Sequence, residues 1–413
     1  MARPVPLHIA PANAPTRQAG GLGAPGRVAH VHAQTRRGLV VAAGFTLLAI
    51  VTGIAGVGDG WWLPLHLFVV GGLLSAISAA TQMFAVIWSA APSPPSYVAG
   101  AQRWALAAGA IALVVGRETD QTWLFVGGAA TVVAAMLAVA SILARVRGRA
   151  VTDRFKPAIE AYVGAVAAGT VGMSLGTVLG TDRAGDQAAE LRGVHLALNV
   201  FGLVGLVIAG SLPYFTATQV RSKMSARATP TAMRVTFLVL AASTAVAAAG
   251  QAFDRPGVVA GGLISYALGL LVLATMLPVY AASRIRWAGP RVLQLMTGMA
   301  WWVAMTVALA LAGLRGADDR TILRALVIGG FAQILVASLA YLGPVLRGGG
   351  HLQLTAGFAI TRSWVSLAAG NTAALSALAG HGSILAVVLA VWLSDIAVRA
   401  GRLLATTRSR DRV

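Results

Sequence analysis

A run of 19 residues without formal charge, HLFVVGGLLSAISAATQMF, occupies positions 66–84. A helix of roughly 20 apolar residues crosses the ~30 Å hydrocarbon layer of a membrane. Two similar runs follow, HLALNVFGLVGLVIAGSLPYF at 195–215 and ILRALVIGGFAQILVASLAYLGP at 322–344. Their recurrence predicts an all-α polytopic membrane protein that contains internal repeats.

The composition of the whole chain supports this fold class. Of the 413 residues, 57% are apolar and only 11% are charged, so a water-soluble globular protein of this size is excluded. The chain contains no cysteine. This excludes a disulfide framework, a thiolate copper centre, a covalent c-type haem and a thiol nucleophile.

Hydropathy and length predict twelve transmembrane helices. The first is too long, and has too poor a cleavage site, for a removable secretory signal. The expected spans are 37–56, 61–90, 98–116, 122–144, 157–180, 192–218, 233–251, 257–283, 291–313, 323–346, 357–379 and 383–405.

The spacing of the similar runs predicts three four-helix repeats. His66 and His195 are 129 residues apart, and Ser211 and Ser338 are 127 apart, so each interval holds four spans. An even number of helices returns each copy to the same side, which implies a pseudo-threefold axis along the membrane normal. We expect a disordered basic tail at 1–36, repeats at 37–147, 156–283 and 288–405, and a second tail at 406–413.

The basic residues predict the orientation. The chain has 32 Lys and Arg against 13 Asp and Glu, a net charge of +19. With twelve spans, 25 of the 32 basic residues fall on one side of the bilayer. Because cytoplasmic loops collect Arg and Lys, we expect a plasma-membrane protein with both termini in the cytoplasm. The basic residues are scattered and lack interleaved aromatic residues, which argues against a nucleic-acid partner.

Two histidines are the strongest candidates for a cofactor site. His66 and His195 occupy corresponding repeat positions, near the outer ends of the second and sixth helices. Two neutral imidazoles at one depth could ligate a haem iron or contribute to a copper site. The alternative is a pair of histidines that bond only to backbone, Asn199 or Arg192. The sequence indicates no catalytic residues.

Three amides are further polar candidates inside the predicted spans: Asn199, Gln82 and Gln333. Such residues are costly in lipid and often functional, but amides also join neighbouring helices by hydrogen bonds. Together with Ser338 they could line a pathway, whereas interhelical bonding is the simpler interpretation.

Small residues and charge pairs have structural explanations. A ridge of glycines on the fifth helix, at 172, 176 and 180, predicts a packing face. Glu160 lies four residues after Lys156, and Asp395 lies four before Arg399, so each pair can meet along its own helix.

Three stretches carry a family resemblance: WLPLHLFVVGGLLSAISAATQMFAVIW at 62–88, VHLALNVFGLVGLVIAGSLPYF at 194–215 and GGFAQILVASLAYLGPVLRGGG at 329–350. They resemble the membrane portion of actinobacterial copper oxidases, or multicopper-oxidase-domain (nitrite-reductase-like) proteins. In that family a twelve-helix membrane part precedes extracytoplasmic cupredoxin domains. The helix arrangement is also similar to that of subunit I of haem-copper oxidases.

The departures from this resemblance limit what it implies. No cupredoxin portion follows the last helix and there is no cysteine, so we do not expect multicopper oxidase chemistry. By the resemblance, His66 corresponds to a low-spin haem ligand and His195 to a copper ligand. The tenth helix offers Ile322, Phe331 and Gln333 but no histidine. We therefore expect no oxygen-reducing binuclear centre.

Three functional hypotheses follow. The first is a non-catalytic, redox-associated membrane module or anchor, surrounded by the lipid bilayer and serving an extracytoplasmic cupredoxin or other redox protein. The second is a haem- or copper-binding electron-transfer subunit that uses His66 and His195. The third is a small-molecule or ion transporter, for which we expect discontinuous helices and a chain of charged groups at the membrane midplane.

A reporter enzyme that is active only outside the cytoplasm tests the orientation. Fused after Arg412 it should be inactive, whereas a fusion after Asp120 should be active, because Asp120 lies in a predicted outer loop. Activity measured in intact cells gives the answer. The reverse pattern would show that the termini are outside.

Overall fold

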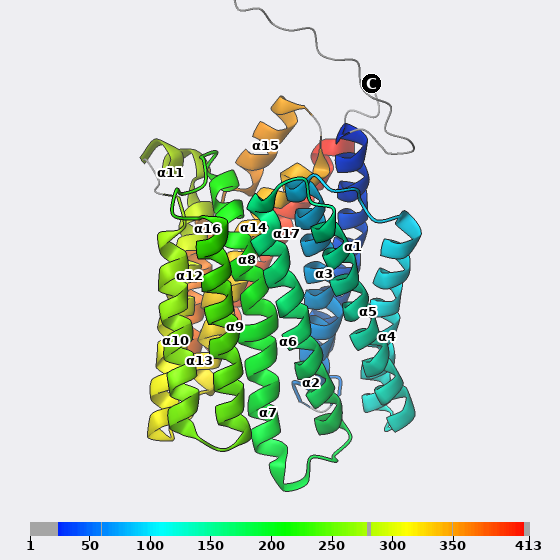
Figure 1. The fold of residues 1–413 in the computed structure, drawn as a ribbon, viewed down its shortest axis with the longest axis vertical. Coiled ribbons are helices and arrows are strands. Elements are labelled where there is room, and N and C mark those ends of the chain that lie inside the picture. Colours follow the sequence, from blue (N-terminus) through cyan, green and yellow to red (C-terminus); the bar gives the residue numbers. More distant parts are fainter. Residues whose placement is uncertain (1–23, 59, 279–281, 349, 409–413) are drawn as a thin grey trace, which may run out of the picture.

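The computed structural model describes residues 24–58, 60–278, 282–348 and 350–408, and every regular element within them is helical. Eleven of the helices in these ranges are long and apolar enough to cross a membrane. The predicted all-α class is therefore confirmed, and the eleven long apolar helices agree with a polytopic membrane protein. Figure 1 shows the helices as a bundle in which most of them run along the long axis.

The elements follow one another in three groups, in which α denotes an α-helix and η a 3₁₀- or π-helix. The first group is α1 (Ala24–Ala55), α2 (Trp62–His66), η1 (Leu67–Leu73), α3 (Leu74–Ser89), α4 (Ser96–Glu118) and α5 (Thr122–Gly148). The second is η2 (Asp153–Phe155), α6 (Lys156–Gly180), η3 (Gly185–Gln187), α7 (Ala188–Ala197), η4 (Leu198–Gly205), α8 (Leu206–Gln219), α9 (Pro230–Ala252) and α10 (Pro256–Thr275). The third is α11 (Ala282–Ala288), α12 (Pro290–Arg315), α13 (Arg320–Ala325), η5 (Leu326–Ala332), α14 (Gln333–Arg347), α15 (His351–Thr361), α16 (Trp364–Leu378) and α17 (Gly382–Arg408).

Most predicted spans match a helix, with differences at some ends. Helix α1 begins at Ala24, inside the segment expected to be a tail, and the earlier residues of that segment lie outside the described ones. Helix α10 ends at Thr275, eight residues before the predicted end at 283. Pro278 follows, and a proline disfavours helical geometry in the residue before it. Most of the expected tail at 406–413 also lies outside the described residues.

The span expected at 357–379 is not one helix. It begins within α15 and continues in α16, and between them Arg362 and Ser363 have extended backbone. Helix α16 has only 15 residues, fewer than the roughly 20 that cross a bilayer. This break explains why the structure has eleven long apolar helices where hydropathy predicts twelve. Averaged hydropathy cannot detect it, because the segment stays apolar on both sides.

Each of the three runs quoted from the sequence contains a π-helical segment. These segments are η1, η4 and η5, and they begin at Leu67, Leu198 and Leu326. Each contains two glycines, and the flanking α-helices continue on both sides without a loop. π-Helical turns are rare and occur frequently at functional sites.

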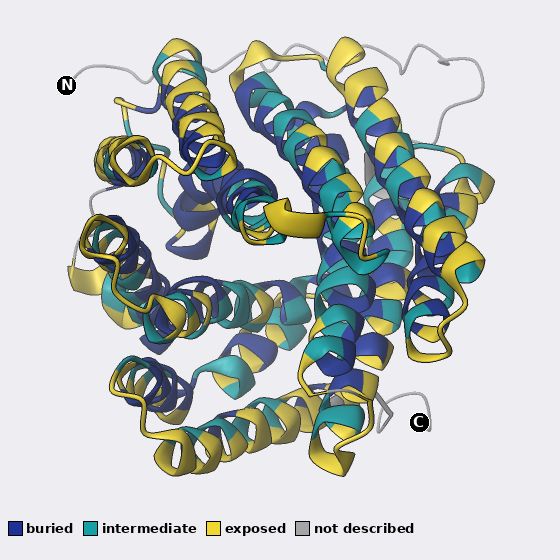
Figure 2. Cartoon of the chain, turned by 90° about the horizontal axis from the view of Figure 1, so that it is seen from below, coloured by how far each residue is buried: buried dark blue, intermediate teal, exposed yellow. Residues whose placement is uncertain are grey.

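The helices that contain the π segments are the innermost ones. Of the most apolar part of each, 61% is buried in Trp62–Ser89, 61% in Gly185–Gln219 and 50% in Arg320–Arg347, against only 6% in the last helix. Figure 2 shows the outer helices with mixed exposed and buried faces around more fully buried ones. We call these three the inner helices.

Aromatic side chains connect the inner helices toward one end of the bundle. The ring of Phe84 on α3 lies 5.9 Å from that of Phe215 on α8, and Phe215 lies 5.6 Å from Tyr341 on α14. Phe84 also stacks on Trp88 at 4.5 Å. Contacts of this kind add to the burial of apolar surface.

The outer helices pack as pairs and expose apolar side chains. Helices α4 and α5, α9 and α10, and α16 and α17 form closely packed neighbours, while α5 contacts α6 and α10 contacts α12. Outward residues such as Leu47, Leu238 and Val387 are more than half exposed. An apolar surface of this extent is expected where a protein faces lipid rather than water.

The close approach of α4 and α5 can be tested with two adjacent glycines. A Cβ atom at Gly128 would lie 2.3 Å from the backbone nitrogen of Leu113, whereas at Gly127 it would meet no described heavy atom within 4 Å. We expect Gly128→Ala to lower the free energy of unfolding by about 1–3 kcal/mol, because the helices must separate. Gly127→Ala should be neutral or mildly stabilising. Denaturation of the purified proteins in detergent measures both, and equal effects would contradict the packing.

Candidate functional site

His66 is the last residue of α2 and lies directly before η1. Its Nδ1 is 2.8 Å from the carbonyl oxygen of Trp62, one turn earlier, and its ring stacks on the Trp62 indole at 4.2 Å. A carbonyl oxygen only accepts hydrogen bonds, so Nδ1 carries the proton. The second ring nitrogen, Nε2, therefore keeps the lone pair that can ligate a metal.

His195, on α7, also has its Nδ1 bonded to a backbone carbonyl group, but this group belongs to another helix. Its Nδ1 donates to the carbonyl oxygen of Gly172 on α6 at 2.7 Å, and this bond again leaves Nε2 as the unprotonated nitrogen. Asn199, in η4, donates to the His195 carbonyl oxygen at 2.8 Å. Metal-binding histidines typically hold the other ring nitrogen in such a bond, which fixes the tautomer and the ring orientation.

The glycine ridge on α6 makes room for these side chains. A Cβ at Gly172 would lie 2.5 Å from the Asn199 amide, and one at Gly176 would lie 2.7 Å from the His195 ring. The predicted packing face is therefore confirmed, and it receives polar side chains as well as apolar ones.

Gln82 belongs to a separate polar cluster between α1, α3 and α4. Its amide donates to the Ser78 hydroxyl at 3.0 Å, and Ser78 donates to Gln102 at 2.9 Å. A cavity of about 40 Å³ adjoins them and is also lined by Arg103 and Ser75. This volume holds a few water molecules, since one water needs roughly 10–15 Å³ on the same measure.

Gln333 belongs to a third cluster, at the junction of η5 and α14. Its amide donates to the Gly329 carbonyl oxygen at 3.1 Å and exchanges hydrogen bonds of 3.3 Å with Asn371 on α16. Trp301 donates to Asn371 at 2.9 Å. The interpretation of Gln333 as an interhelical link agrees with this geometry.

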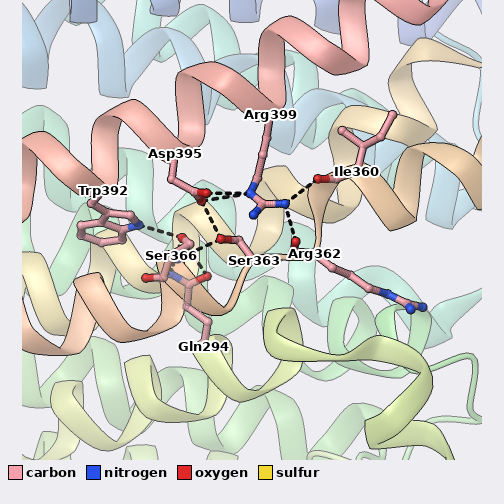
Figure 3. A network of polar contacts seen from close by, with 8 residues as sticks. All are labelled: Gln294, Ile360, Arg362, Ser363, Ser366, Trp392, Asp395 and Arg399. Carbon is pink, nitrogen blue, oxygen red and sulfur yellow. Dashed lines mark hydrogen bonds and ion pairs between the residues drawn. The ribbon is translucent and has the colours of Figure 1, made fainter.

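A polar network surrounds the break between α15 and α16 (Figure 3). Arg399 on α17 donates to the carbonyl oxygens of Ile360 and Arg362, which have lost their helical partners at the break. It also binds Asp395 at 2.9 Å. Ser363 caps α16 by accepting from the Ser366 backbone and donating to Asp395 at 2.6 Å.

The network continues into the neighbouring helices through Ser366. Gln294 on α12 donates to the Ser366 hydroxyl at 3.2 Å, and Trp392 donates to it at 2.7 Å. All three side chains are buried. The broken backbone is thereby held from both α12 and α17.

The structure brings together only some of the predicted site residues. His195 and Asn199 are in contact, whereas His66 bonds to Trp62 of its own helix, and Gln82 and Gln333 lie in other clusters. The pairing of Asp395 with Arg399 is confirmed.

The predicted partner of Glu160 is wrong. Its carboxylate binds Arg147 at 2.6 Å and Arg234 at 2.8 Å, while Lys156 binds Asp153. Two arginines from neighbouring helices reach Glu160, and their forked donors suit a carboxylate better than a single ammonium group does.

Sequence reasoning missed the residues around the break. Gln294 lies on α12, far in the sequence from Ser363 and Ser366 at the start of α16. A serine followed three residues later by another in an apolar stretch was the available signal for a helix start.

A scan of protein-family models finds no match for the chain, and no curated protein matches it.

Arg399 tests whether the network holds the break. We expect Arg399→Ala to lower the free energy of unfolding by about 1–3 kcal/mol, because two backbone carbonyls and the Asp395 carboxylate lose their donor. Arg402→Ala, three residues later and exposed, is the matched control and should change little. Unfolding of both variants in detergent measures the difference. Equal stability would mean that the network contributes nothing.

Proposed function

We propose that this chain is a redox-associated membrane module of the copper-oxidase-like family, without a catalytic centre of its own, in which His66 and His195 hold a haem. The observation that carries the proposal is the hydrogen-bonding pattern that the two imidazoles share. Each has Nδ1 bonded to a backbone carbonyl, which leaves Nε2 to ligate, and the two lie on two of the three inner helices. When bound, haem supplies one-electron transfer.

The donor set fits haem better than copper. Haem iron in proteins takes imidazole as an axial ligand, so two histidines suffice. Copper electron-transfer sites combine two histidines with a cysteine, and this chain has none. Among the described residues there is also no group of three His, Cys, Asp or Glu side chains that could hold a metal ion.

The proposed architecture is three four-helix repeats with twelve crossings, the broken pair α15 and α16 supplying one of them. The π segments at corresponding positions of the inner helices support this repeat. The bundle would lie in the plasma membrane with both termini in the cytoplasm. His66 and His195 would then lie toward the outer face, where an extracytoplasmic cupredoxin or other redox protein could exchange electrons.

The visible spectrum of the protein purified in mild detergent tests the haem. We expect a Soret band that shifts on reduction, and its loss in a His66→Ala/His195→Ala variant, because both proposed ligands are removed. His351→Ala is the matched control, since His351 is exposed at the start of α15. A spectrum without the band after expression with added haem would disprove this proposal.

A second proposal, a small-molecule or ion transporter, is supported by one observation. The discontinuity between α15 and α16 is a feature of membrane transporters, whose binding sites use broken helices. Flux of labelled solutes into liposomes that contain the purified protein tests this alternative. A broken helix is not itself evidence for any particular solute.

A further inference from the structure

Three arginines from separate segments contact Trp287 on α11. The guanidinium carbon of Arg221, which follows α8, lies 4.1 Å from the ring centre, and that of Arg291 on α12 lies 5.7 Å away. Arg362, in the break before α16, donates a hydrogen bond to the Trp287 carbonyl oxygen. In Figure 3 the Arg362 guanidinium points away from Arg399, to which it contributes only its carbonyl group.

Arg291 is buried although it carries a charge. Only 1% of it is exposed, and Nε donates to the Ala288 carbonyl oxygen at 3.2 Å. Its two terminal nitrogens have no hydrogen-bond partner among the described residues. The rings of Phe358 at 4.8 Å and Tyr341 at 5.6 Å provide cation–π contacts. Such contacts only partly offset the cost of burying an ion.

The described residues provide no carboxylate for this cluster. None of the ion pairs among them includes Arg221, Arg291 or Arg362. Nε of Arg362 is likewise buried without a partner in the described part of the chain. Arg221 and Arg291 both lie near the Trp287 ring, so their like charges are close together. Three like charges held together imply an anion that neutralises them.

The start of α12 adds donors to the same place. The helix begins at Pro290 after Gly289, which has φ +66°, and its first turn has no acidic residue and no side-chain cap. The first backbone N–H groups of a helix have no partner within the helix, and its dipole favours an anion there. Arg291 is the second residue of this helix, so its side chain and these N–H groups belong to one site.

We propose that Arg221, Arg291 and Arg362, with the first turn of α12, bind a phosphate group. Forked guanidinium donors from three sides suit the several oxygens of a phosphate, which also binds well at helix starts. The phosphate belongs either to a phospholipid headgroup or to a soluble solute. The site lies at the end of the bundle that contains α11 and α15, opposite α2 and α7 (Figure 1), so it is independent of the histidine pair.

Thermal stability of the full chain in detergent distinguishes the two sources. One titration uses inorganic phosphate against chloride at equal ionic strength, and the other uses short-chain phosphatidylglycerol against phosphatidylcholine. Stabilisation by phosphatidylglycerol alone identifies a lipid headgroup, and stabilisation by inorganic phosphate identifies a soluble phosphate compound. Native mass spectrometry then counts the molecules retained per chain.

Three variants complete the test. Arg362→Gln and Arg291→Gln should each weaken the stabilising titration about tenfold or more, because each removes charge-assisted hydrogen bonds. Arg221→Gln, at an exposed position, keeps the test valid if Arg291→Gln does not fold, and it should weaken binding severalfold. Arg149→Gln, exposed in the first third of the chain, is the control and should bind like the parent. No stabilisation by either probe, or equal binding by all four variants, would overturn the site.

Discussion

In a bilayer every backbone N–H and C=O group needs a partner inside the protein, since no water is available to bond it. This requirement explains why the described residues form helices throughout. It also explains what happens where the chain departs from α-helical geometry. At η4 the Tyr266 hydroxyl donates to the Phe201 carbonyl oxygen, and after η5 the Gln333 amide donates to that of Gly329. At the break before α16, Arg399 donates to the carbonyl oxygens of Ile360 and Arg362.

A polar residue inside the bundle can therefore have two roles at once. It can satisfy a backbone group, and it can hold a ligand. His66 and Asn199 each bond to a carbonyl four residues earlier, next to a π segment, as a structural residue would. The same bond on His66 fixes its tautomer and leaves Nε2 for a ligand, as does the bond of His195 to Gly172. A cofactor site that grew from such bonds would need little change to the surrounding helices.

The two ends of the bundle differ in chemistry. The end with α2 and α7 holds the two histidines, and the end with α11 and α15 holds three arginines, of which Arg291 is buried beside aromatic rings. Because the proposed phosphate site is built from charged groups and the proposed haem site from neutral imidazoles, salt should affect ligand binding at the first and hardly affect it at the second. Each proposed site joins helices that are far apart in the chain. A ligand bound at either site would therefore stabilise the packing of those helices against each other.

The apolar composition and the positions of most spans could be read from the chain, because a helix that crosses a bilayer must be long and apolar. The ion pair of Asp395 with Arg399 was also predictable, since it joins neighbouring turns of one helix. The break at Arg362 and the π segments were not, because hydropathy is unchanged by a local shift in hydrogen bonding. Nor could the arginines around Trp287 or the partners of Glu160 be foreseen. Those contacts join residues far apart in the chain, and only the packing of helices against one another brings them within reach.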